Sequence, residues 1–146
     1  MKTTMRWQSF KRNFLLIALV LPAAVCLPAP GVEEAAESAA LTWLAALDVG
    51  DYPTTWKTAS SYFKEHISAT NWAAAAAASA RGSMGALKSR RLTSATFTRT
   101  LPGAPEGDYV VLLFKTSFDG KTDAVETVTP TKEVDGTWHV SGYYIK

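Results

Sequence analysis

The chain of 146 residues has few of the side chains that catalytic and metal sites commonly require. It contains one cysteine, Cys26, and two histidines, His66 and His139. A single cysteine cannot form a disulfide within the chain, and with two histidines it cannot complete a closed zinc site. Gly82 and Gly85 lack the accompanying lysine of a phosphate-binding loop, and no Gly-x-Ser-x-Gly motif is present. We therefore expect neither a metal nor a cofactor.

The first 26 residues have the pattern of a bacterial-type secretion signal. Four basic residues come first, residues 14–25 carry no charge, and small residues lie near Cys26. The uncharged stretch is shorter than the roughly 20 residues that cross a bilayer as a helix. We expect export with residues 1–26 removed, a short linker at residues 27–31, and a single domain at residues 32–146, located in the periplasm.

Cys26 leaves two outcomes open. It could carry a lipid after cleavage in front of it, which would anchor the protein to a membrane, or the signal could simply be cut nearby. Val25 is branched, whereas a lipoprotein signal has a small residue at this place, so ordinary cleavage is favoured. Contact with a membrane is expected only if Cys26 is lipidated.

Removing the signal reverses the sign of the net charge. All 13 acidic residues but only 11 of the 15 basic residues follow residue 26, which leaves a formal net charge of −2. Charges of both signs are interspersed, as on an ordinary soluble surface. A nucleic-acid partner is therefore not expected.

The first half of the domain predicts three helices. Apolar side chains recur at helical spacing up to Gly50 and again from Trp56 to Ile67. A third helix contains Trp72 and the six alanines that follow it, since alanine is the best helix former.

The second half predicts four strands, at residues 92–101, 108–114, 124–129 and 138–145, with hairpin signals at Asp119-Gly120 and Asp135-Gly136. Pro130 indicates an edge or a strand end. Strict alternation in the last strand places Trp138, Val140 and Tyr144 on one face, and His139, Ser141, Tyr143 and Ile145 on the other. Helices followed by hairpin-linked strands predict an α+β fold, with three helices packed on a four-stranded antiparallel meander, as in cystatin-like and NTF2-like folds.

Several stretches resemble a family of exported bacterial proteins, domain of unknown function family 4019. The similarity covers most of the domain and runs through residues 44–52, 81–90, 102–110, 124–128 and 135–143, with Trp56 and Trp72 between them. The resemblance implies a small envelope domain with no established activity.

Two histidines are candidates for acid–base chemistry. His139 could pair with Glu126 on the neighbouring strand, since opposed side chains of antiparallel strands approach closely. The alternative is a polar pair on the solvent-facing side of the sheet. His66 is interpreted as a solvated histidine near a helix end.

Arg81, Arg90 and Glu126 form a second group. The two arginines could bind an anion, or one of them could neutralise Glu126 in a structural ion pair that joins the third helix to the sheet, which is the favoured interpretation. The aromatic residues, among them Trp56, Trp72 and Tyr143, could line a ligand pocket or form the core itself.

No convincing catalytic constellation emerges, so an enzyme is the less favoured interpretation. The leading hypothesis is an envelope domain that binds a partner protein or a small ligand, with Arg81, Arg90, Trp56, Trp72 and Tyr143 as candidate ligand contacts. One alternative is a small-pocket enzyme that uses His139 and Glu126. Another is a structural or assembly subunit, and the oligomeric state stays open.

Overall fold

The computed structural model describes residues 31–146 and has the predicted α+β architecture. The secretion signal, the linker up to residue 30 and Cys26 lie outside the described residues. In residues 31–146, no helix has the length and apolar character needed to cross a membrane. The elements are α1 (Val32–Asp48), α2 (Tyr52–Lys57), α3 (Ser61–His66), α4 (Ala69–Ala78), α5 (Ala80–Ser83), β1 (Leu87–Thr98), β2 (Tyr109–Phe118), β3 (Ala124–Lys132) and β4 (Trp138–Ile145).

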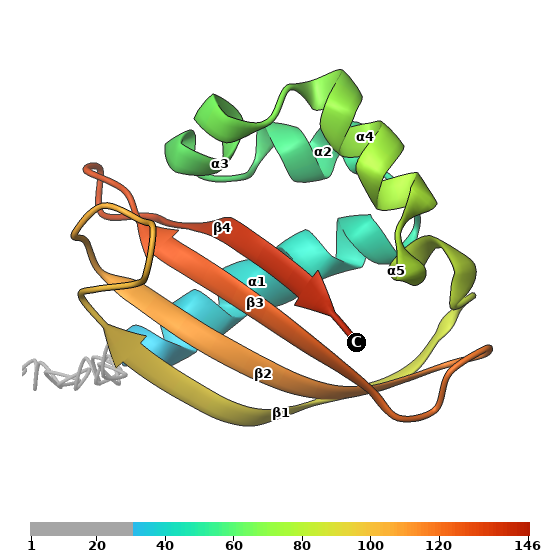
Figure 1. Ribbon diagram of the computed structural model, residues 1–146. Helices are drawn as coiled ribbons and strands as arrows, with labels where there is room; N and C mark the ends of the chain where they lie inside the picture. Colours follow the sequence, from blue (N-terminus) through green and yellow to red (C-terminus); the bar gives the residue numbers. More distant parts are fainter. Residues whose placement is uncertain (1–30) are drawn as a thin grey trace, which may run out of the picture.

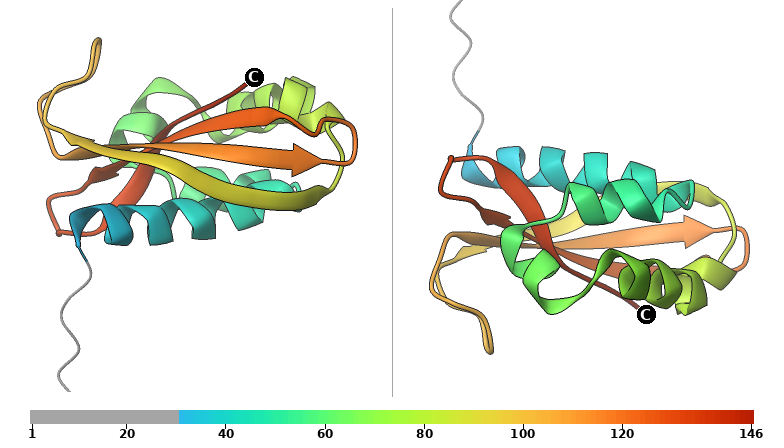
Figure 2. Two further views of the ribbon diagram at one scale, coloured as in Figure 1. Left: turned by 90° about the horizontal axis from the view of Figure 1, so that it is seen from below. Right: turned by 90° about the horizontal axis from the view of Figure 1, so that it is seen from above.

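The four strands form one antiparallel sheet in sequence order, as predicted for a meander. The sheet is curved, and α1 lies along its concave side in contact with all four strands (Figure 1). The shorter helices form an arc that packs on α1 and β4 (Figure 2). The main core lies between α1 and the sheet and includes Ala36, Ala40, Trp43, Leu44, Leu47, Val110, Leu112, Phe114, Val128 and Val140.

The C-terminal end of α1 is fixed by its glycine. Gly50 has a φ of +74°, and its N–H donates to the carbonyl of Leu47, while the Asp51 N–H donates to the carbonyl of Ala46. These two bonds form a Schellman motif, which ends a helix at a defined residue. Asp48 is thereby held as the last residue of α1.

The helix expected between Trp56 and Ile67 is divided into α2 and α3. Ser60 lies at the break, where its N–H donates to the carbonyl of Val140 at 2.9 Å and its Oγ accepts from the Phe63 N–H at 3.1 Å. A continuous helix would use the Ser60 N–H internally. The contact with β4 and the new N-cap replace that bond.

A bulge in β4 accommodates Pro130. Thr129 is opposite Gly142 and Pro130 is opposite Val140, so Ser141 has no partner in β3 and its hydroxyl donates to the carbonyl of Thr129. Proline cannot donate to a strand ladder, and a bulge is a place where this loss is tolerated. The prediction that Pro130 marks an edge or strand end was wrong, because β3 is an inner strand and continues to Lys132.

The same bulge reverses the predicted faces of the end of β4. Tyr143 packs against the core that contains Val140, while Tyr144, predicted beside Val140, is 62% exposed. An extra residue shifts the two-residue side-chain period by one. Tyr143 therefore points toward the helices, where it becomes part of the site described below.

Candidate functional site

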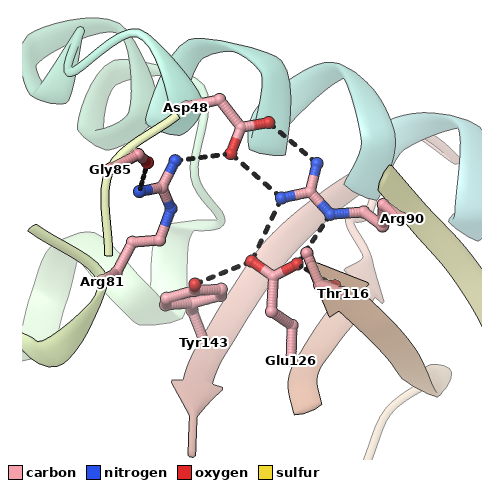
Figure 3. A network of polar contacts seen from close by, with 7 residues as sticks. All are labelled: Asp48, Arg81, Gly85, Arg90, Thr116, Glu126 and Tyr143. Atoms are coloured by element: carbon pink, nitrogen blue, oxygen red, sulfur yellow. Dashed lines mark hydrogen bonds and ion pairs between the residues drawn. The ribbon is translucent and has the colours of Figure 1, made fainter. Parts of the chain in front are cut away.

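Six polar side chains meet where the end of α1 lies over the sheet (Figure 3). Each comes from a different element, namely α1, α5 and each of the four strands. We call this group the charge network, and its members are Asp48, Arg81, Arg90, Thr116, Glu126 and Tyr143.

Glu126 is the most deeply buried member, with none of its surface exposed. Arg90 binds it with two hydrogen bonds, from Nε at 2.6 Å and from Nη2 at 3.1 Å. The hydroxyls of Thr116 and Tyr143 donate to it at 2.6 and 2.8 Å. A buried carboxylate is costly without partners, and here both oxygens accept from two donors each.

Asp48 connects the two arginines. Its Oδ2 accepts from Arg90 Nη1 at 2.8 Å, and its Oδ1 accepts from Arg90 Nη2 at 3.0 Å and from Arg81 Nη2 at 2.9 Å. Burial alone would raise the pKa of Asp48, but the hydrogen bonds and charges of Arg90 and Arg81 outweigh it and hold the pKa below its ordinary value. Asp48 is therefore ionised at neutral pH.

Arg81 reaches the network from α5. Its Nη1 donates to the carbonyl of Gly85 at 3.1 Å, and its Cζ lies 4.3 Å from the centre of the Phe118 ring. Gly85 has a φ of +77°, and a Cβ there would lie 3.1 Å from Asp119 Cβ, so glycine is required. Within residues 31–146, Arg81 Nε is the one buried side-chain nitrogen or oxygen without a hydrogen-bond partner.

Tyr143 is held in its neutral form. Burial is the largest cause that raises its pKa, and the charge of Glu126 and the hydrogen bond to it raise the pKa further, against the opposing charges of Arg81 and Arg90. Arg90 itself is held in its charged form, because the hydrogen bonds and charges of Asp48 and Glu126 outweigh the effect of burial and raise its pKa. The network therefore pairs two arginines with two carboxyl side chains, those of Asp48 and Glu126.

The predicted pairing of His139 with Glu126 does not form. The register places His139 opposite Thr131 and Glu126 opposite Ile145, so the two lie at different levels of the sheet. His139 Nδ1 is 2.9 Å from the carbonyl oxygen of Thr58, and its Nε2 is 2.8 Å from Thr137 Oγ1. Neither the possible acid–base pair nor the favoured polar pair on the solvent-facing side forms, because both interpretations placed His139 opposite Glu126 and the β3–β4 register does not.

Arg90 has no free face toward an incoming anion. Its Nε and both terminal nitrogens already donate to Asp48 or Glu126. An anion could bind these nitrogens only by displacing a carboxylate that the fold holds in place. The contacts are those of a structural ion pair, extended to Asp48, which joins helices to the sheet.

A pocket of about 290 Å³ lies beside the charge network, between the end of α1, α4 and the end of β4. Three of the predicted ligand contacts, Trp72, Arg81 and Tyr143, line it, and the remaining lining residues are Leu47, Ala75, Ala76, Ser79, Tyr144 and Ile145. Trp56 does not line it, because its Nε1 donates to the carbonyl of Ile67 and its ring packs against the core.

The predicted aromatic cluster serves both as core and as pocket wall. Trp72 is packed against Trp43 and Phe63, with ring centroids 5.8 and 5.0 Å apart, and its Nε1 donates to Thr55 Oγ1. Tyr143 also packs against Trp43, with ring centroids 5.6 Å apart. Aromatic pairs at these separations are attractive beyond their burial, so these contacts hold the two rings in place in the wall.

His66, the other histidine, is exposed at the end of α3. Its Nδ1 is 2.8 Å from the carbonyl oxygen of Tyr62, and its ring packs on the Tyr62 ring with centroids 4.1 Å apart. In residues 31–146, no three histidine, cysteine, aspartate or glutamate side chains are grouped so that they could hold a metal ion.

Sequence reasoning missed Asp48 and Thr116. Asp48 carries a signal that could have identified it, because a carboxylate in the last turn of a helix is unfavourable beside the negative end of the helix dipole. A carboxylate at this position therefore predicts a cationic partner from another element of the fold. Thr116 carries no comparable signal, since threonine is ordinary in a strand.

Comparison with known proteins identifies a family for most of the domain. A family model described as "Protein of unknown function (DUF4019)" matches residues 39–143, which include every member of the charge network. No curated protein matches, and no solved structure matches. The expected likeness to cystatin-like and NTF2-like folds therefore stays a prediction.

Replacing Glu126 with glutamine should strongly destabilise the protein. The substitution removes the buried charge that neutralises Arg90. It also places the amide hydrogens of glutamine against groups that donate to Glu126. Breaking a buried pair in this way costs about 3–5 kcal/mol. Chemical denaturation of the variant and the wild type measures this loss. The matched control is Asp119→Asn, which breaks the exposed ion pair with Lys88 and should cost less than about 1 kcal/mol. Equal losses in the two variants would contradict a central role for Glu126.

The stabilisation that ionised Asp48 gives to the folded protein should disappear in acid. Its folded-state pKa is below the ordinary 3.8, so the unfolded chain takes up a proton first as the pH falls. The stabilisation is therefore complete above the ordinary pKa and is lost as the pH falls through the folded value. Denaturation of the wild type and Asp48→Asn should differ most at neutral pH and progressively less below pH 3.8. A difference that does not change with pH would show that the charge of Asp48 is not what stabilises the fold.

Proposed function

We propose that this chain, which belongs to the DUF4019 family, is an exported domain of the cell envelope that binds a small molecule without catalysing a reaction on it. The observation that carries the proposal is the pocket of about 290 Å³, which gathers three ligand contacts expected from the sequence, Trp72, Arg81 and Tyr143. Ligand sites are typically concave, largely apolar and placed between structural elements, as this pocket is.

Small side chains on α4 and at its C-cap leave the space open. Ala75, Ala76 and Ser79 face it, where larger side chains would fill it. The opposite wall is held from behind, because Tyr143 is bonded to Glu126 and Arg81 to Asp48. A preformed wall lowers the ordering cost of binding. Asp48, Arg90, Thr116 and Glu126 thus support the pocket from behind without lining it, while Arg81 and Tyr143 form part of its wall.

A binding role fits the network better than a catalytic one. A general base must be able to accept a proton from a substrate within hydrogen-bond reach. Both oxygens of Glu126 and both oxygens of Asp48 already accept from internal donors. The Tyr143 hydroxyl donates to Glu126, and burial raises its pKa, so it is a poor proton shuttle.

Export is supported by the pattern of the first 26 residues. When the full chain is produced in a bacterial host, the protein should accumulate in the periplasmic fraction with a shortened N-terminus. Mass spectrometry of that N-terminus checks this. A start at Leu27 without added mass excludes lipidation of Cys26, a lipid-bearing Cys26 establishes the anchor, and an uncleaved cytoplasmic chain contradicts export.

Binding can be tested with a neutral apolar dye, N-phenylnaphthylamine, added to the protein purified after export. We expect saturable fluorescence with a Kd on the order of 0.1 mM or tighter, as the efficiency of small ligands allows. Ala75→Phe places a ring at the pocket mouth and should weaken binding about tenfold, a loss of about 1.4 kcal/mol.

Ala74→Phe is the matched control, because Ala74 is exposed on the same helix and does not line the pocket. It should leave the Kd within about twofold of the wild type. Equal effects of the two substitutions, or dye fluorescence that never saturates, would contradict the pocket as the binding site.

A further inference from the structure

Three polar side chains in the pocket wall, those of Ser79, Arg81 and Tyr143, use their hydrogen-bonding groups elsewhere, and the fourth, Tyr144, is 62% exposed. The hydroxyl of Ser79 donates to the carbonyl of Ala76 at 2.7 Å, and that of Tyr143 donates to Glu126. Each terminal nitrogen of Arg81 already donates, to Gly85 or to Asp48, and its unpartnered Nε is covered by protein. The wall therefore presents mostly carbon to a ligand, although Ser79, Arg81, Tyr143 and Tyr144 line it.

The charges behind the wall also cancel. Arg81 and Arg90 are matched by Asp48 and Glu126, so the network has no net formal charge. A carboxylate in the pocket would find Arg81 already neutralised, and an ammonium group would find every carboxylate oxygen already accepting a hydrogen bond. An ion that leaves water needs a partner of opposite charge. Each charged side chain beside this pocket is already paired with another side chain of the network.

We propose that the ligand is a small neutral apolar molecule, with no ionised group inside the pocket. This inference rests on the proposed function and adds the chemical class of the ligand. It replaces the simplest interpretation of Arg81 and Arg90, in which two arginines bind an anion. The reason is that all three nitrogens of Arg90 donate to carboxylates of the fold, while Arg81 donates to Asp48 and to the Gly85 carbonyl and its Nε is buried.

Three probes of matched shape test the class: para-butylbenzamide, para-butylbenzoate and para-butylbenzylammonium. Isothermal titration of the exported protein should give a Kd for the neutral amide at least about tenfold lower than for either ion. The reason is that an ion loses its hydration on entering the pocket and finds no opposite charge to offset that loss. The Kd of the amide should also be unaffected by raising the salt from 0.05 to 0.5 M, because no charge pairing is involved. Ala75→Phe should weaken binding of the amide, and Ala74→Phe should not.

The outcomes separate this inference from the proposed function. If the benzoate binds as tightly as the amide or more tightly, and Ala75→Phe blocks it, the pocket binds a ligand but the neutral class is overturned. Tighter binding of the ammonium probe overturns it in the same way. If the dye binds at the pocket and neither ion does, the neutral class holds, whereas failure of the dye and all three probes overturns the proposed function itself.

Discussion

The buried contact between Glu126 and Arg90 is the interaction on which the rest of the structure depends. Glu126 has no exposure to solvent, so the chain can bury it only if Arg90, Thr116 and Tyr143 arrive together. Those three residues come from the other three strands. The carboxylate therefore specifies one register for the whole sheet, since a shift in any strand would leave a charge without its partner. Arg90 also binds Asp48, the last residue of α1, so the same contact fixes the position of that helix on the sheet.

The glycine turn after α1 and the bulge in β4 make this contact possible. The first ends the helix at Asp48, so that its carboxylate meets both arginines. The second turns Tyr143 inward, where its hydroxyl reaches Glu126 and its ring becomes part of the pocket wall. Each is a local backbone irregularity that moves a single side chain to the place where the network needs it. Arg81, whose terminal nitrogens are held by Asp48 and Gly85, completes the wall beside Tyr143.

Much of this arrangement could be predicted from local sequence. Helical spacing and hairpin signals predicted the α+β class and the meander, and the burial expected for Glu126 pointed to an arginine partner. The division at Ser60 could not be predicted, because it depends on a hydrogen bond to Val140, 80 residues away. The reversed face of Tyr143 depends on pairing across Pro130, and the separation of His139 from Glu126 depends on strand register. All three features depend on contacts between residues far apart in the sequence, which the propensities of single residues do not specify.

The alanine run of α4 has a consequence for how this domain can change over generations. Alanine favours the helix by intrinsic propensity, and α4 packs into the core through Trp72 and Ala76, its two buried residues. At Ala75, which is exposed and lines the pocket, a methyl group can be exchanged for a longer side chain with little disturbance to the core. The size of the pocket is thus adjustable in small steps, independently of the ion pairs that hold the sheet. Under the proposed binding role, exchanges at Ala75 would change which molecules fit the pocket while leaving the core residues in place.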